Sequence, residues 1–229
     1  TPSRADSDLL INAPATSPPV GVVAQVLGDP NIDSEELTAW ELGIRSQPNP
    51  DVFWDAAVFI NSYDELQDFN GSLPPAFPVI NRSVALNQSD GIDTWGGELA
   101  TTLQLTPDWQ VRTAYTFFRG QLRADGATVG AIEDTSRNIL YMQSSWDLPY
   151  EMEFDLIPRY ADRHLNGTPA YFEMDARWGA HLSDAIEVFV VGRNLLDGQH
   201  LEFTENFNGV LNVVHEVRRG VHAGVTMRY

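Results

Sequence analysis

The chain of 229 residues carries 14 basic and 32 acidic residues, which give a formal net charge of −18. Such an acidic balance repels phosphate backbones, so no nucleic acid is expected as a partner. Cysteine is absent, which excludes disulfide bonds and thiol chemistry. No run of about 18 apolar residues is present either, so the sequence predicts no transmembrane helix.

Nine segments follow the two-residue period of a β-strand with one apolar and one polar face. The alternation is regular in VFWDAAVFINSY, WQVRTAYTF, EMEFDLIPRYADR, YFEMDARWGAHL and RGVHAGVTMRY, and weaker in four further segments. We therefore predict antiparallel strands joined as successive hairpins. In chain order they occupy residues 37–47, 52–63, 94–105, 109–117, 138–148, 151–163, 171–182, 186–196 and 219–229.

The connections between these strands alternate in length. Four are short and turn-like, at residues 47–51, 106–108, 148–151 and 182–184. The others are longer and polar, at residues 66–93, 121–137 and 204–217, with 164–170 as a shorter member. A transmembrane β-barrel has short periplasmic turns and long outer loops, whereas a soluble sandwich has no reason to sort its loops by end. The pattern thus favours an up-and-down membrane barrel.

Aromatic residues mark two levels along the strands. Trp54, Trp109 and Trp146 lie beside short turns, while Trp95 and Phe172 lie toward the long loops. Aromatic girdles of this kind flank the apolar band of a membrane barrel. The apolar faces carry almost no charge, as lipid contact requires, because a lipid-facing Arg or Lys at midplane costs about 2–4 kcal/mol.

The polar faces are rich in charge and would line an aqueous lumen. A ladder of solvated cross-strand pairs is the ordinary explanation of such a pattern, with each exposed pair contributing a few tenths of a kcal/mol to about one. The candidates for ligand-facing lumen residues are Arg159, Arg163, Arg177, Glu173 and Asp175.

No catalytic, cofactor or metal site is expected. The sequence has no Gly-rich phosphate loop, no zinc-spaced set of His and Cys, and no nucleophile elbow. A cation site in the loops, formed by Glu202, Glu205, His215 and Glu216, is a weaker alternative because their spacing matches no known ligand set.

Several segments, in the same order, resemble the barrel of TonB-dependent receptors. They are TPSRADSDL, the strand–turn–strand unit GDPNIDSEELTAWELGIRSQPNPDVFWDAAVFINSYDEL, the hairpins GIDTWGGELATTLQLTPDWQVRTAYTF and PAYFEMDARWGAHLSDAIEVFVVGRNLLD, and the closing GVTMRY. Two departures concern the subfamily: Trp40 stands where Tyr is usual, and Leu196 stands where Phe is common.

The resemblance implies a fold and a function. The family has a closed barrel of about 22 strands with a plug in its lumen, and it imports ferric siderophores, cobalamin or other scarce nutrients. The chain is similar to the C-terminal part of such a barrel: about nine strands, unclosed alone, over residues 37–229, preceded by an outer loop or irregular segment at 1–36. The terminal Tyr229 resembles the signal read by the barrel-assembly machinery.

The same resemblance implies location and partners. We expect a bacterial outer-membrane receptor and not an enzyme, with a ferric siderophore as the ligand. Outer-membrane lipid and lipopolysaccharide would surround it, and the TonB complex would act through an N-terminal part that this chain lacks.

Two alternatives stay open at this point. If residues 18–27 formed a tenth strand, the chain could close as a complete small barrel, either porin-like or an enzyme. A soluble acidic β-sandwich used for binding is the other.

Overall fold

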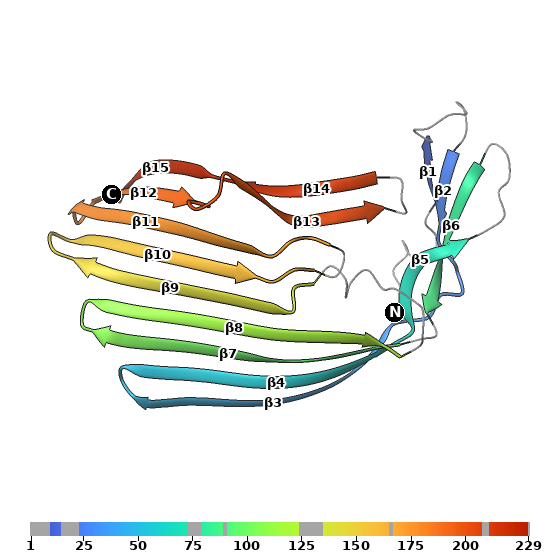
Figure 1. The fold of residues 1–229 in the computed structure, drawn as a ribbon, viewed down its shortest axis with the longest axis horizontal. Coiled ribbons are helices and arrows are strands. Elements are labelled where there is room, and N and C mark those ends of the chain that lie inside the picture. The colour runs from blue at the N-terminus through green and yellow to red at the C-terminus, as the bar shows by residue number, and fades with distance from the viewer. Residues whose placement is uncertain are drawn as a thin grey trace. The chain divides into compact units, whose positions relative to one another are not determined.

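The computed structural model describes residues 10–14, 23–72, 79–88, 91–123, 135–164, 167–207 and 211–228. These residues form β-strands and connections, and none of their segments is a helix long and apolar enough to cross a membrane. The strands fall into three sheets (Figure 1). They are β1 (Leu10–Pro14), β2 (Val23–Leu27), β3 (Glu36–Asn49), β4 (Val52–Asp64), β5 (Leu66–Ser72), β6 (Val79–Gln88), β7 (Ile92–Thr106), β8 (Trp109–Leu122), β9 (Asn138–Leu148), β10 (Met152–Ala161), β11 (Tyr171–Ser183), β12 (Ile186–Arg193), β13 (Gln199–Phe207), β14 (Leu211–Arg218) and β15 (Gly220–Met227).

The largest sheet contains nine strands in the order β15-β12-β11-β10-β9-β8-β7-β4-β3. These are the nine strands that the alternation predicts. The short turns that join β3 to β4, β7 to β8, β9 to β10 and β11 to β12 lie at one end of this sheet (Figure 1). Among the described residues, β3 and β15 are its two edges, so the sheet is not closed by itself.

The alternative of a closed ten-stranded barrel is wrong. The segment proposed as its tenth strand contains β2, which lies in a separate four-stranded sheet of order β1-β2-β6-β5. There β2 pairs antiparallel with β1 and parallel with β6.

The register of the large sheet separates apolar from polar side chains. Between β10 and β11, Phe154 lies opposite Trp178, whereas Arg159 lies opposite Glu173 on the other face. At the C-terminal edge, Val225 of β15 lies opposite Val188. The predicted faces of the last strand are therefore confirmed up to Arg228, while Tyr229 lies outside the described residues.

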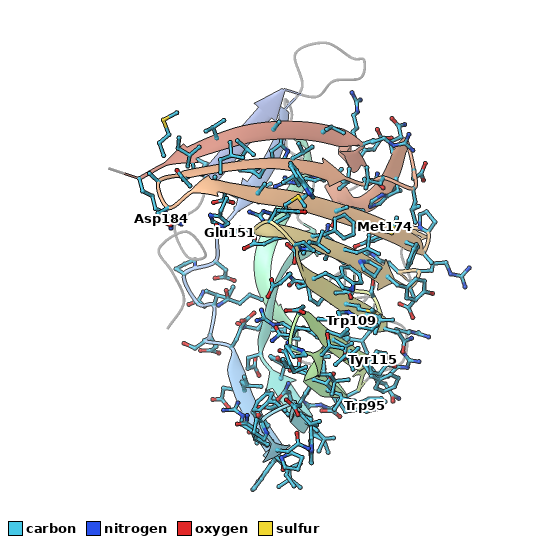
Figure 2. The ribbon with its side chains drawn as sticks, turned by 90° about the vertical axis from the view of Figure 1, so that its left-hand side faces the viewer. Trp95, Trp109, Tyr115, Glu151, Met174 and Asp184 are labelled. Atoms are coloured by element: carbon cyan, nitrogen blue, oxygen red, sulfur yellow. The ribbon has the colours of Figure 1, made fainter. Side chains whose placement is uncertain are left out.

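The apolar face is exposed. Leu42 of β3 and Met227 of β15 are 74% and 69% accessible. A sandwich would bury this face against a second sheet about 10 Å away. In Figure 2, Trp95, Trp109, Tyr115 and Met174 lie along one side of the sheet.

A ladder of aromatic rings lies on this face beside the short turns. The ring of Trp146 stacks on Trp109 with centroids 5.9 Å apart, and on Phe154 at 5.6 Å. The indole Nε1 of Trp109 donates to Ser144 Oγ at 2.8 Å. This satisfies the one polar atom of a ring that is otherwise suited to an apolar surface.

The segments predicted as long polar loops also contain strands. Residues 66–93 include β5 and β6, and residues 204–217 include most of the β13–β14 hairpin. Among the described residues of 1–36, two short strands, β1 and β2, occupy part of the segment expected to be irregular. The prediction of strands relied on the apolar stripe needed to contact lipid. A strand that does not contact lipid needs only backbone hydrogen bonds to its neighbours. Its sequence therefore does not need an apolar residue at every second position.

Candidate functional site

The candidate site lies on the polar face of the large sheet, where β10 and β11 pair. Arg159 of β10 donates from Nη2 to Glu173 Oε1 at 2.7 Å and to Asp175 Oδ2 at 2.6 Å. Both carboxylates belong to β11 and are nearly buried, with 6% and 9% of their surfaces exposed. Because a buried charged group requires a partner, the Arg159 guanidinium compensates the burial of these two side chains in the wall.

The turn after β12 completes the hydrogen bonding of Asp175. The backbone N–H of Asn194 donates to Asp175 Oδ1 at 2.9 Å. Asn194 is fully buried and has a φ of +48°, a left-handed conformation that Asn tolerates better than most residues. Its Nδ2 donates to the Val217 carbonyl at 3.1 Å, and the N–H of Leu195 donates to the Met174 carbonyl at 2.9 Å. The motif at residues 194–197 thus ties the end of β12 to β11 and β14.

A cavity of about 440 Å³ opens above these groups. The β13–β14 hairpin contributes Glu202 and Val217 to its lining. The ring of His200, in the same hairpin, stacks on Tyr171 with centroids 4.5 Å apart. The Tyr171 hydroxyl also donates to the carboxylate of Glu202. The side chain of Arg193 makes no ion pair or hydrogen bond with the other described residues and is exposed. The cavity is lined by Arg159, Tyr171, Glu173, Asp175, Arg193, Glu202 and Val217.

Arg177 is the centre of a second charged cluster. Its Nη1 lies 2.9 Å from Glu153 Oε2, its Nη2 donates to Glu187, and Asp155 Oδ2 is 3.8 Å away. The guanidinium lies beside Gly179, where an added Cβ would be only 3.0 Å from it. Three strands thus share one guanidinium, and the cluster is satisfied without a ligand.

The structure brings together three of the five predicted lumen residues. Arg159, Glu173 and Asp175 line the cavity, whereas Arg177 belongs to the separate cluster. Arg163 follows the end of β10, is exposed and does not line the cavity.

Sequence reasoning missed the other lining residues. Tyr171 lies two positions before Glu173 in β11, and Arg193 lies six positions after Glu187 in β12. The two-residue period therefore places both on the polar face, and applying it to the full length of each strand would have found them. Glu202 lies at an irregularity in the β13–β14 register, which no sequence pattern announces. Within the described ranges, no group of three or more metal-ligating side chains gathers. The side chain of Glu205, one of the four residues of the cation-site alternative, lies outside the described ones, so that alternative stays untested.

Hydrogen bonds fasten the ends of β8, β9 and β10 that lie away from the short turns. Asp162 accepts from the N–H of Arg137 at 2.7 Å and from Asn138 Nδ2 at 2.6 Å, and Tyr115 donates to Asn138 Oδ1 at 2.7 Å. Partial burial alone would raise the pKa of Asp162. The hydrogen bonds from Asn138 and Arg137 and the charge of Arg119 outweigh that effect and hold the pKa below its ordinary value.

Arg123 fastens the corresponding ends of β4 and β7. Its guanidinium donates to Asp64 Oδ1 at 2.7 Å, to Asp93 Oδ1 at 3.1 Å and to the Tyr63 carbonyl at 2.7 Å. Gly91 makes room for this arrangement, because a Cβ there would lie 2.3 Å from the Tyr63 carbonyl and 2.4 Å from Arg123 Nη2.

Comparison with solved structures finds the same fold in outer-membrane receptors. The ferric yersiniabactin uptake receptor FyuA from Yersinia pestis has a TM-score of 0.67 at 18% identity, covering 94% of this chain and 33% of that one. The siderophore receptor PirA from Pseudomonas aeruginosa has a TM-score of 0.71 at 15% identity, covering 99% and 37%. The copper transporter OprC has a TM-score of 0.71 at 14% identity, covering 91% and 34%. The chain thus spans about a third of each of these proteins.

Family membership rests on the sequence itself. A comparison with curated proteins gave no significant match. The family model for the TonB dependent receptor-like β-barrel, however, matches residues 6–195, which is most of the chain. The barrels of this family lie in the bacterial outer membrane and serve transport, not enzymatic catalysis. The chain therefore belongs to the TonB-dependent receptor family, as part of its outer-membrane β-barrel.

Proposed function

We propose that the protein containing this chain takes up a scarce nutrient across the outer membrane in a TonB-dependent manner, and that the nutrient is a ferric siderophore. The observation that carries the proposal is the family match over an unclosed sheet with one apolar and one charged face. The choice of a siderophore is supported by the similarity to FyuA, to PirA and to the receptor FpvA, solved bound to pyoverdine.

In this proposal the five predicted lumen residues form the wall that the ligand meets, with unequal roles. Arg159, Glu173 and Asp175 satisfy one another and shape the cavity. Arg193 and the Tyr171–Glu202 pair keep hydrogen-bonding capacity toward the lumen. A ligand rich in oxygen atoms would accept from Arg193, whose planar fork suits carboxylate and similar groups. Arg177 and Arg163 would act on the ligand only through their charge.

The proposal also assigns roles to the other parts of the receptor and to its partners. Residues 37–229 form the C-terminal barrel wall, and residues 1–36 belong to the outer surface. The outer segments at 67–93, 124–136 and 205–216 select the ligand, because an apolar face in contact with lipid cannot be selective. The TonB complex acts through the N-terminal part of the parent receptor, and the barrel-assembly machinery recognises the last strand with Tyr229.

The test is uptake by cells that express the full-length receptor as their only copy. Radiolabelled ferric siderophores of several chemical classes and copper ions are offered separately. Arg193→Ala should reduce uptake of the accepted ferric siderophore at least several-fold, while Arg112→Ala, at the other end of the wall, should not. Uptake of copper but of no ferric complex would refute the siderophore assignment. Uptake that is independent of TonB would refute the proposed function.

A further inference from the structure

Glu202 is the carboxylate of the cavity that has no cation of its own. It is exposed and accepts a hydrogen bond from the Tyr171 hydroxyl, but it forms no ion pair with another residue that the structure describes. Glu173 and Asp175, in contrast, share the Arg159 guanidinium. The carboxylate of Glu202 is therefore free to act on a molecule that enters the cavity.

The position of Glu202 follows from the fold of the β13–β14 hairpin. The register of the two strands shifts between Leu201 and Phe203, so Glu202 has no residue directly opposite it in β14. Such an irregularity redirects a side chain. The cavity lies at the long-loop end of the sheet, because Tyr171 begins β11 and Arg193 ends β12. The hairpin extends from this end, away from the short turns (Figure 1). A ligand that arrives from the outer side thus reaches Glu202 before it passes the rest of the wall.

The cavity carries one unpaired group of each sign. The guanidinium of Arg193, which has no partner among the described residues, can donate to oxygen atoms of a ligand. Glu202 can pair with a cation. Three carboxylates and two guanidiniums line the cavity in all, so a ligand with several negative charges meets net repulsion. Like charges brought together across an interface are an effective way to exclude a wrong partner.

We propose that Glu202 determines specificity in this cavity, and that the ligand is a ferric trihydroxamate that carries an ammonium group. This inference rests on the proposed function and goes beyond it by naming the chemical class of the siderophore. Three hydroxamates neutralise ferric iron and present oxygen atoms to which Arg193 can donate, while the ammonium group pairs with Glu202. Three catecholates instead leave the complex with three negative charges, which Glu202 repels.

The test measures binding of radiolabelled ferric complexes to cells whose only ferric-siderophore receptor is the full-length protein, and uptake by the same cells. One linear ferric trihydroxamate is offered in three forms: with a free terminal ammonium group, with that group acetylated, and with it succinylated. The three forms share the iron centre and differ in charge, from positive through neutral to negative. The wild-type receptor should bind the ammonium form about five-fold more tightly than the acetylated form, which is the upper end of what an exposed ion pair contributes. The succinylated form should bind most weakly, and a ferric tris-catecholate should not be taken up.

Variants of Glu202 separate its own charge from the acidity of the whole chain. Glu202→Gln keeps an acceptor for the Tyr171 hydroxyl and should lower the preference for the ammonium form to less than about two-fold. Glu202→Lys should reverse the order of the three forms. The matched control is Glu98→Gln, which removes a carboxylate from the polar face of β7, outside the cavity, and should keep the wild-type preference.

The amount of folded receptor is measured for every variant by the mobility of the unheated protein on gels, and binding is expressed per folded barrel. Equal binding of the ammonium and acetylated forms by the wild type, an unchanged preference in Glu202→Gln, or uptake of the tris-catecholate would each overturn this proposal and leave the siderophore assignment standing. Uptake of no ferric complex would overturn both.

Discussion

Removal of Arg159 is the most informative perturbation of the inner wall. Arg159→Met keeps the length of the side chain but leaves Glu173 and Asp175, 6% and 9% exposed, without their shared cation. Removing one partner of a buried ion pair costs about 3–5 kcal/mol. The Arg159 side chain is 39% exposed, so water screens part of the interaction, and we expect a loss of about 2–3 kcal/mol.

The assay is unfolding of the full-length receptor by urea in lipid vesicles, followed by tryptophan fluorescence. Adding Glu173→Gln to Arg159→Met removes one stranded charge and should recover about half of the loss. Arg193→Met serves as the matched control, because the Arg193 side chain lines the same cavity and has no partner in the part of the chain that the structure describes. This substitution should change stability by less than about 0.5 kcal/mol. A loss below about 1 kcal/mol for Arg159→Met, or no recovery in the double variant, would refute the reasoning.

Three further predictions follow from particular contacts. Gly224→Val places a Cβ 2.4 Å from the ring of Phe189 and should destabilise the barrel by about 1–3 kcal/mol in the same urea titration; Phe189→Leu should restore much of the loss, and a neutral Gly224→Val would contradict the packing. Glu151→Gly, at a φ of +56°, should stabilise by up to about 1 kcal/mol, whereas Asp184→Gly in a turn without positive φ should not. Asp162 stabilises the fold above its ordinary pKa of 3.8 and loses this contribution as the pH falls through its lower folded-state pKa. Asp162→Asn should remove that acid dependence, and an unchanged dependence would show that other carboxylates cause it.

The membrane-facing sheet could be predicted from sequence because lipid imposes a strong pattern. Every second residue must be apolar over the full height of the membrane, so Phe154, Leu156 and their neighbours identify the strand, its face and its limits. The same rule placed Arg159, Glu173 and Asp175 on the lumen side. Their convergence on one guanidinium needed the register, which the sequence does not contain.

The strands outside the membrane-facing sheet and the remaining cavity residues could not be predicted, because they depend on contacts between distant segments. Strands β5, β6, β13 and β14 carry no membrane stripe, so their residues read as polar loop. Glu202 lines the cavity as part of the β13–β14 hairpin, whose His200 ring stacks on Tyr171 of β11. Asn194 belongs to the hairpin that resembles the family, but its physical role, a left-handed turn whose N–H donates to Asp175, is visible only in three dimensions.

The shared guanidiniums of β10 and β11 have a consequence for how the barrel assembles. A slip of two residues between these strands keeps every apolar side chain in lipid, so the membrane cannot detect the error. The charges can detect it: in one direction the slip sets Asp155 opposite Asp175, and in the other it sets Arg177 opposite Ile157. Each wrong pairing brings like charges together or strands an ion. The charged pairs on the polar faces of β10 and β11 therefore favour the native register over the slipped registers that contact with lipid alone would accept.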